Sequence, residues 1–171
     1  NEIAEFSKHT GPVRSVSFSK NGKLLASSGD DGTTRLWSLE ERELAKWQGD
    51  RNSIQDLVLS RDGKFVATAG EDGKIRLWDL EGKLLSEFSG HYSLISSISL
   101  SPDNQLLAGV SKNGTVHLWN LQGELLQTLP TQISFPETIE FSPNGQLLAI
   151  AGANGIIKLW NFQGELVAEL S

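Results

Sequence analysis

Apolar and polar residues alternate in short stretches along the whole chain, and four of these stretches end in the same two residue types. They read TTRLW, KIRLW, TVHLW and IIKLW. Their tryptophans, Trp37, Trp78, Trp119 and Trp160, follow one another at intervals of 41 residues without a shift. A constant period of about 40 to 45 residues indicates identical supersecondary units packed in series. The chain is therefore predicted to contain four copies of one structural unit.

Each period contains two further strand-like stretches ahead of its tryptophan. The first alternates apolar and polar residues and ends in serine, at residues 13–19, 54–60, 95–101 and 136–142. The second reads LLAS, FVAT, LLAG and LLAI, with an alanine at the same place in every period. Such alternation is typical of half-buried strands, and the fixed small residue implies that a neighbouring sheet approaches closely.

Turn-forming residues separate these stretches. The first turn contains Asn21-Gly22 and Asp62-Gly63 in the first two periods and begins with Pro102 and Pro143 in the last two. The second turn is Asp-Gly or Asn-Gly in every period, at residues 31–32, 72–73, 113–114 and 154–155. These residues tolerate the backbone angles that tight hairpins require. Each period is thus predicted to hold four short antiparallel strands, and the fold class is all-β.

One kind of stretch ends every period and also precedes the first one. Its five copies read EIAEF, ELAKW, KLLSEF, ELLQTL and ELVAEL. We therefore predict an outer strand within residues 1–7, followed by four repeats at residues 8–48, 49–89, 90–130 and 131–171. Residues 1–171 are expected to form a single repeat segment.

The repeats resemble the tryptophan-aspartate (WD) repeat family of β-propellers, and the resemblance covers essentially the whole chain. Only Trp78-Asp79 is the dipeptide that names the family; the other tryptophans precede Ser38, Asn120 and Asn161. The resemblance implies four-stranded blades around a central channel, with the innermost strand directly after the loop that opens each repeat. Closed rings of the family commonly hold about seven blades, so four blades are expected to form half of an eight-bladed ring.

The acidic composition narrows the choice of partners. The formal net charge is −6 and the sequence pI is about 5.1, whereas proteins that bind nucleic acid usually present a basic face. The chain has no cysteine, no apolar run of membrane-spanning length and no Gly-rich phosphate loop. We expect a cytoplasmic protein with no nucleic-acid or membrane partner, no cofactor and no metal.

His9, Ser27 and Asp31 imitate a catalytic triad. A nucleophile, a base and a carboxylate fall within one period, but no oxyanion hole or exposed nucleophile turn accompanies them. The resemblance implies instead a buried chain of hydrogen bonds in which these residues and Trp37 satisfy one another's polar groups. We predict a structural hydrogen-bond network and no catalytic residue.

The network positions change along the chain. The second repeat has Asp50, Thr68, Asp72 and Trp78; the third has His91, Gly109, Asn113 and Trp119; the fourth has Gln132, Ile150, Asn154 and Trp160. Two carboxylates that face each other in the interior repel, so Asp50 is predicted to turn to solvent beside Arg51. The third repeat lacks the hydroxyl, and the fourth lacks both hydroxyl and histidine. Only the first repeat is complete.

In the WD-repeat family, partners contact one face of the ring at three positions per repeat. Carried over to this chain, the positions are Pro12, Arg14 and Asp30; Ser53, Gln55 and Glu71; Leu94, Ser96 and Lys112; and Phe135, Glu137 and Ala153. Leu94 and Phe135 are candidate apolar anchors on a face of mixed charge. Ordinary rim residues are the equally open alternative.

A basic residue stands two positions before each marker tryptophan. The row consists of Arg35, Arg76, His117 and Lys158. A solvated strand face explains this row more simply than a site for an anion.

These patterns favour a non-catalytic protein–protein interaction scaffold that presents a rigid propeller rim. The alternatives are a regulatory or sensing portion of a larger multidomain signalling protein, and a propeller enzyme. A half ring exposes two apolar blade faces, so two copies are expected to form a homodimer with twofold symmetry. At each junction, the strand ELVAEL of one copy is expected to displace residues near 1–7 of the other.

Overall fold

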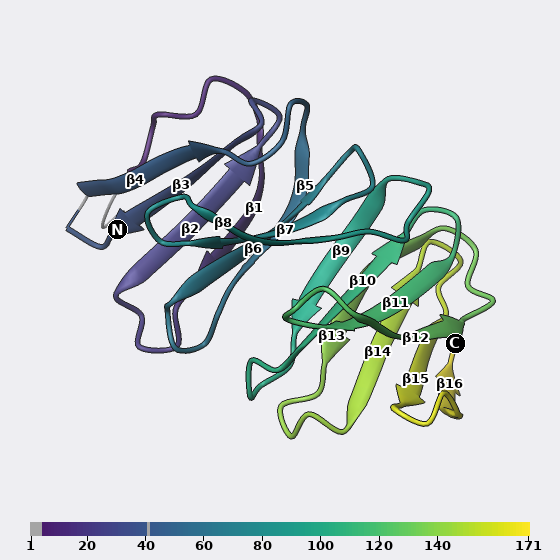
Figure 1. Ribbon diagram of the computed structural model, residues 1–171. Helices are drawn as coiled ribbons and strands as arrows, with labels where there is room; N and C mark the ends of the chain where they lie inside the picture. Colours follow the sequence, from purple (N-terminus) through teal and green to yellow (C-terminus); the bar gives the residue numbers. More distant parts are fainter. Residues whose placement is uncertain (1–4, 41) are drawn as a thin grey trace.

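The computed structural model describes residues 5–40 and 42–171, which form sixteen strands in four antiparallel sheets (Figure 1). The strands are β1 (Val13–Phe18), β2 (Leu24–Gly29), β3 (Thr33–Ser38) and β4 (Arg42–Gln48); β5 (Ile54–Leu59), β6 (Phe65–Gly70), β7 (Ile75–Asp79) and β8 (Leu84–Phe88); β9 (Ile95–Leu100), β10 (Leu106–Ser111), β11 (Thr115–Asn120) and β12 (Leu125–Pro130); and β13 (Pro136–Phe141), β14 (Leu147–Gly152), β15 (Ile157–Asn161) and β16 (Leu166–Leu170). Each sheet contains four consecutive strands hydrogen bonded in chain order. The predicted all-β class and the four strands per repeat are confirmed. No helix in the described part of the chain is long and apolar enough to cross a membrane.

A serine after each innermost strand fixes the first hairpin. The hydroxyl oxygen of Ser19 accepts the backbone N–H of Leu24 at 3.0 Å, and the hydroxyl donates to the side chain of Asn21 at 2.8 Å. Ser60, Ser101 and Ser142 make the same two kinds of contact in the other repeats. Gly22, within this turn, has a φ of 67°, which a glycine adopts without strain. The recurring serine in the sequence thus closes a turn.

The sheets pack face to face in a row, with the first and fourth sheets at opposite ends (Figure 1). The innermost strands β1, β5, β9 and β13 lie side by side, as the resemblance implies. Three clusters of buried apolar side chains fill the junctions between neighbouring sheets. Ala26, Ala67 and Ala108 belong to these clusters and are fully buried. Their small side chains therefore allow the close approach that the sequence indicates.

Hydrogen bonds between innermost strands align neighbouring sheets. The hydroxyl oxygen of Ser17 accepts the backbone N–H of Leu59 in the second sheet at 3.1 Å. In the same way, Ser99 in the third sheet accepts the backbone N–H of Phe141 in the fourth sheet at 3.2 Å. Ser17 and Ser99 occupy equivalent positions of their repeats. The first and third junctions therefore share a polar contact as well as an apolar core.

Asp56 joins three sheets. The hydroxyls of Ser15 in the first sheet and Ser97 in the third donate to its carboxylate, at 2.7 and 2.9 Å. The backbone N–H of Ile98 donates to the same carboxylate at 2.9 Å. These three hydrogen bonds hold the carboxylate in place between the sheets. Asp56 is thus an inter-sheet clamp, and the sequence pattern gave it no role.

The structure tests the outer strand predicted within residues 1–7 only in part. Residues 1–4 lie outside the described residues, and residues 5–12 form no strand. Phe6 nevertheless packs on Trp37, with ring centroids 5.1 Å apart. Outer strands of the first and second sheets supply similar contacts to the tryptophan of the following sheet, so Phe6 takes the place of such a strand residue.

Candidate functional site

The first-repeat network forms a continuous chain of hydrogen bonds. The indole N–H of Trp37, on β3, donates to the hydroxyl of Ser27, on β2, at 2.8 Å. This hydroxyl lies 2.8 Å from Nε2 of His9, whose Nδ1 lies 3.0 Å from the carboxylate of Asp31. The order of contacts is the one that the resemblance implies. The loop before β1 is thereby attached to the centre of its own sheet.

The carboxylate of Asp31 holds the loop and the turn together. It accepts the backbone N–H groups of Thr10 and Thr33, each at 3.0 Å. Burial by itself raises the pKa of Asp31, but these hydrogen bonds, with those from the Thr33 hydroxyl and from His9, hold the pKa well below its usual value. Asp31 is therefore ionised at neutral pH and acts as an acceptor.

This arrangement does not present Ser27 as a nucleophile. Ser27 is 4% exposed, and its hydroxyl contacts Trp37 and His9 within the sheet. A nucleophile needs access to its substrate and a site beside it for the developing oxyanion. The geometry fits a structural network, in which the hydroxyl satisfies two buried ring nitrogens.

Replacing Ser27 with alanine is expected to lower the free energy of unfolding by about 1–3 kcal/mol, because Trp37 and His9 would retain buried polar atoms without a partner. Ser28→Ala is the matched control, since Ser28 is fully buried in the same strand and its hydroxyl has no partner within the described residues. Urea unfolding followed by tryptophan fluorescence measures both variants. Equal losses at the two positions would contradict the role of the hydroxyl.

In the second repeat the prediction for Asp50 is wrong, because this residue is buried and does not turn to solvent beside Arg51. The side chain of Asp50 is 1% exposed, and its carboxylate lies 3.1 Å from Nη1 of Arg76. Nη2 of the same guanidinium lies 2.5 Å from the carboxylate of Asp72. The carboxylate of Asp50 also lies over Gly70, where any Cβ would collide with it. A cation between the two carboxylates, and not exposure, relieves their repulsion.

The two carboxylates titrate differently. Burial, together with the neighbouring Asp72, raises the pKa of Asp50. Burial also acts to raise the pKa of Asp72, but hydrogen bonds from Arg76 and from the backbone N–H of Lys74 hold it below its usual value. As the pH falls, Asp50 is therefore the first of the pair to take up a proton.

In the third repeat His91 and His117 stack on each other. Their ring centroids are 4.4 Å apart, and both residues are buried. Gly109 supplies no hydroxyl, and within the described residues both ring nitrogens of His91, Nδ1 of His117 and the indole nitrogen of Trp119 have no hydrogen-bond partner. Burial, with a smaller contribution from the charge of His117, lowers the pKa of His91 to about 4. His91 is therefore neutral at physiological pH.

The fourth repeat replaces the hydroxyl by an apolar side chain. Ile150 is fully buried, and the indole nitrogen of Trp160 has no partner in the part of the chain that the structure describes. Gln132, at the histidine position, is exposed and has a φ of 51°. Removing the polar partners thus leaves one unpaired donor in this repeat.

The basic row is not a solvated strand face, so this prediction is wrong. Arg35, His117 and Lys158 are buried, and the side chain of Arg76 is 16% exposed. Residues two apart point to the same side of a strand, so the row shares the covered side of the marker tryptophans. Arg35 pairs with Glu43, and Nζ of Lys158 donates to the backbone oxygen of Thr131 at 3.1 Å. These cations are used within the fold.

The twelve predicted partner-contact residues lie at one end of the four sheets, which we call the loop face. In every repeat, the residue before the second turn donates its backbone N–H to the carbonyl oxygen of the residue just before the innermost strand. The pairs are Asp30 to Pro12 (2.9 Å), Glu71 to Ser53 (3.1 Å), Lys112 to Leu94 (2.9 Å) and Ala153 to Phe135 (3.1 Å). The structure therefore brings two of the three predicted positions of each repeat into contact.

Polar side chains link the first two repeats across the loop face. Nη2 of Arg14 lies 2.5 Å from the carboxylate of Asp30, and the hydroxyl of Ser53 donates to this carboxylate at 2.6 Å. The amide of Gln55 donates to Ser53 at 2.8 Å and to Glu71 at 3.2 Å. Hydrogen bonds from Arg14 and Ser53 lower the pKa of Asp30. The charges on this part of the face already have partners.

Aromatic side chains dominate the loop face in the third and fourth repeats. Phe135 is 68% exposed and has a φ of 51°, a left-handed conformation that is uncommon for a bulky residue. Tyr92, in the loop before β9, is 97% exposed. Leu94 and Ser96 are half-buried, and Lys112 pairs with Glu137 at 2.9 Å. Sequence reasoning missed Tyr92, although its place beside His91 in an opening loop was an available signal.

No group of three histidine or acidic side chains within the described residues is placed to hold a metal ion.

Comparison with known proteins adds independent information. A family model described as "WD domain, G-beta repeat" matches residues 1–38, 41–79, 82–120 and 123–161. The chain is similar to Nucleoporin SEH1-B of Xenopus laevis (54% identity over 56 residues, 30% of this chain and 16% of that protein). It is also similar to Pre-mRNA-processing factor 19 homolog 2 of Arabidopsis thaliana (43% over 54 residues, 30% and 10%) and to Small ribosomal subunit protein RACK1 of Neurospora crassa (54% over 33 residues, 19% and 10%). The matched stretches thus span a small part of these relatives. Because the family model matches four consecutive repeats that together cover most of the chain, this protein belongs to the WD repeat family.

Proposed function

We propose that this chain is a non-catalytic scaffold that binds a protein partner at its loop face. The exposed aromatic side chains of Tyr92 and Phe135 carry the proposal, because covering a large aromatic side chain that lies in solvent lowers the free energy. Phe135 also adopts an uncommon backbone conformation while it exposes its ring. Strain of this kind tends to persist at functional positions.

The partner segment is expected to be apolar where it meets the loop face. The neighbouring charges are already neutralised, since Lys112 pairs with Glu137 and Arg14 pairs with Asp30. A strongly charged partner would have to break these pairs. An apolar or aromatic segment would cover Tyr92 and Phe135 without doing so, and the net charge of −6 further disfavours a nucleic acid.

The names of two relatives support a role in assemblies. A nucleoporin and a small ribosomal subunit protein are, by name, components of larger complexes. The scaffold role also fits the first-repeat network, where Ser27 is buried in a position unsuited to attack on a substrate. We further propose a cytoplasmic location and self-association of the chain.

Affinity capture tests the scaffold role. The full chain and the double variant Tyr92→Asp/Phe135→Asp are immobilised, incubated with an extract of the native cells, and analysed by mass spectrometry. We expect the affinity of the double variant for its specific partner to be lower by about tenfold or more, as for substitutions of residues that dominate an interface. Leu85→Asp is the control, since Leu85 is 49% exposed on the outer strand β8. Equal capture by the double variant and the wild type would overturn the proposal.

A further inference from the structure

The first sheet exposes a face that the other three sheets bury. Val16 and Phe18, on β1, are 60% and 58% exposed. The equivalent residues of the later repeats are buried: Leu57 and Leu59, Ile98 and Leu100, and Ile139 and Phe141. These later residues belong to the clusters between neighbouring sheets. The exposed face of the first sheet is therefore half of a sheet-to-sheet junction.

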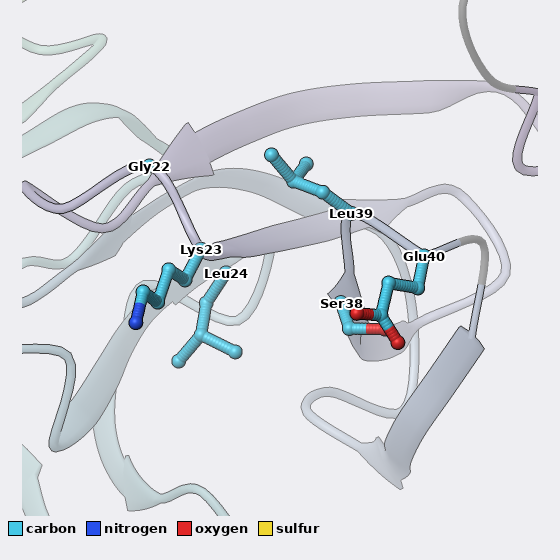
Figure 2. Close-up of a pocket in the computed structure, with 6 residues that line it drawn as sticks. All are labelled: Gly22, Lys23, Leu24, Ser38, Leu39 and Glu40. Atoms are coloured by element: carbon cyan, nitrogen blue, oxygen red, sulfur yellow. The ribbon is translucent and has the colours of Figure 1, made fainter.

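A pocket of about 450 Å³ lies between the first hairpin turn of this sheet and the residues at the end of β3 (Figure 2). It is lined by Gly22, Lys23, Leu24, Ser38, Leu39 and Glu40. Leu39 is 50% exposed, whereas its equivalents Leu80, Leu121 and Phe162 pack against the junction clusters. In the second sheet, the turn at Gly63 that corresponds to Gly22 lies against the Leu24 side chain of the first sheet. The pocket is thus open where a preceding sheet would cover it.

The fourth sheet exposes the matching half of the same junction. Ile157, on β15, is 39% exposed, whereas its equivalents Ile75 and Val116 are fully buried. Ala149 and Leu159 are half-buried, in contrast to their fully or almost fully buried equivalents in the first three sheets. Leu147, the equivalent of Leu24, is also half-buried. The two ends of the row therefore carry the two complementary faces of a junction that occurs three times inside the chain.

We propose that the end face of the fourth sheet docks onto the end face of the first sheet in a second copy of this chain, so that Leu147 enters the pocket beside Leu39. The proposal rests on the self-association proposed above and specifies its surfaces. It extends a junction whose geometry the chain already shows three times. Glu140 occupies the position of Ser17 and Ser99, so its carboxylate accepts the backbone N–H of Phe18 in the second copy. Two such junctions close a ring of two copies.

Phe6 opposes this docking. The marker tryptophan of the second sheet packs on Trp47 of the preceding outer strand, with ring centroids 6.4 Å apart. The third-sheet tryptophan packs on Phe88 at 5.9 Å, whereas Trp37 packs on Phe6 at 5.1 Å. Leu170, on β16, holds the position equivalent to Trp47 and Phe88 and is 52% exposed. Leu170 of a second copy must therefore displace Phe6, which makes Phe6 an intramolecular competitor of assembly.

Sedimentation velocity of the full chain over a range of concentrations tests the proposal. The wild type is expected to associate to twice its mass of 18.7 kDa. Phe18→Asp should weaken association about thirtyfold or more, as for a central interface residue. Phe6→Ala should strengthen it roughly two- to twelvefold, because the competing aromatic contact is lost. Leu85→Asp, on an exposed outer strand, should leave association unchanged. Circular dichroism checks that each variant is folded.

Cross-linking tests which surfaces meet. Ser15 contacts the equivalent residue Asp56 of the next sheet, so Ser15 of one copy should lie beside Thr138 of the other. The chain has no cysteine, so the double variant Ser15→Cys/Thr138→Cys should oxidise to a covalent dimer, whereas each single variant should not.

Three outcomes would contradict the proposed ring of two copies. Monomers of both wild type and Phe6→Ala would refute self-association itself. A dimer that survives Phe18→Asp and does not cross-link would refute the end-face junction alone. A ladder of open oligomers would refute ring closure.

Discussion

Replacing Arg76 with methionine is expected to lower the free energy of unfolding by about 3–5 kcal/mol at neutral pH, the usual cost of removing one member of a buried ion pair. The guanidinium lies 3.1 Å from the Asp50 carboxylate and 2.5 Å from that of Asp72. Methionine keeps most of the volume but leaves two carboxylates facing each other. Urea unfolding at pH 7, followed by tryptophan fluorescence, measures the loss.

The same variant should be less harmful in acid. Burial and Asp72 already raise the pKa of Asp50, and without the guanidinium the proton is held more tightly still. A group with a raised pKa in the folded state stabilises the fold below its ordinary pKa and loses that contribution as the pH rises through the folded-state value. The difference between Arg76→Met and the wild type should therefore shrink as the pH is lowered toward the ordinary range of a carboxyl group.

Two comparisons make this prediction specific. Adding Asp50→Asn to Arg76→Met removes the buried charge and should recover part of the lost stability at pH 7. Leu85→Asp changes an exposed outer-strand residue and should have little effect at either pH. A loss for Arg76→Met that is independent of pH and is not relieved by Asp50→Asn would contradict the account of the carboxylate pair.

The fold was predictable because every repeat places the same residue types in the same surroundings. The serine after each innermost strand closes the same turn four times, and the small alanine and the marker tryptophan recur at the same place in every repeat. Turn chemistry acts between close neighbours in the sequence, and strand alternation fixes which side chains share a side of a sheet. A stretch that is ambiguous in one repeat is therefore resolved by its equivalents in the other three, and this fixes the predicted strand positions.

The wrong predictions at the candidate site concern side-chain contacts that spacing along the sequence does not reveal. The prediction that Asp50 turns to solvent rests on repulsion by Asp72, while Arg76, 26 residues from Asp50, is predicted to lie in a solvated row. The alternation rule could have corrected this, since Arg76 shares a strand side with Trp78, which is buried. Alternation within one repeat does not distinguish Val16, which is exposed, from its equivalent Leu57, which is buried. The number of repeats predicts two exposed end faces, but the residues on them come from the structure.

Replacing Ile150 with alanine is expected to lower the free energy of unfolding by about 2–5 kcal/mol, because it removes buried methyl groups and leaves a cavity between the third and fourth sheets. Ile150 is fully buried within their shared cluster. Val167→Ala is the control on the outer strand β16, where the side chain is 54% exposed and lies away from the proposed end-face junction, and it should cost much less. Thermal and urea unfolding of both variants measure the difference, and equal costs would contradict the assigned packing.

Threonine at position 150 separates packing from hydrogen bonding. Ile150 pairs with Lys158 across the sheet, as Thr68 pairs with Arg76 in the second repeat, where the Thr68 hydroxyl accepts the indole N–H of Trp78 at 2.9 Å. Valine has the same shape as threonine but no hydroxyl, and Ile150→Val should cost about 0.5–1.5 kcal/mol. In most apolar clusters threonine is clearly worse than valine, because its hydroxyl is buried without a partner. Here the unpaired indole N–H of Trp160 supplies one, so we expect Ile150→Thr to be as stable as Ile150→Val or more stable. A markedly less stable threonine variant would show that the fourth repeat cannot rebuild the second repeat's hydrogen bond.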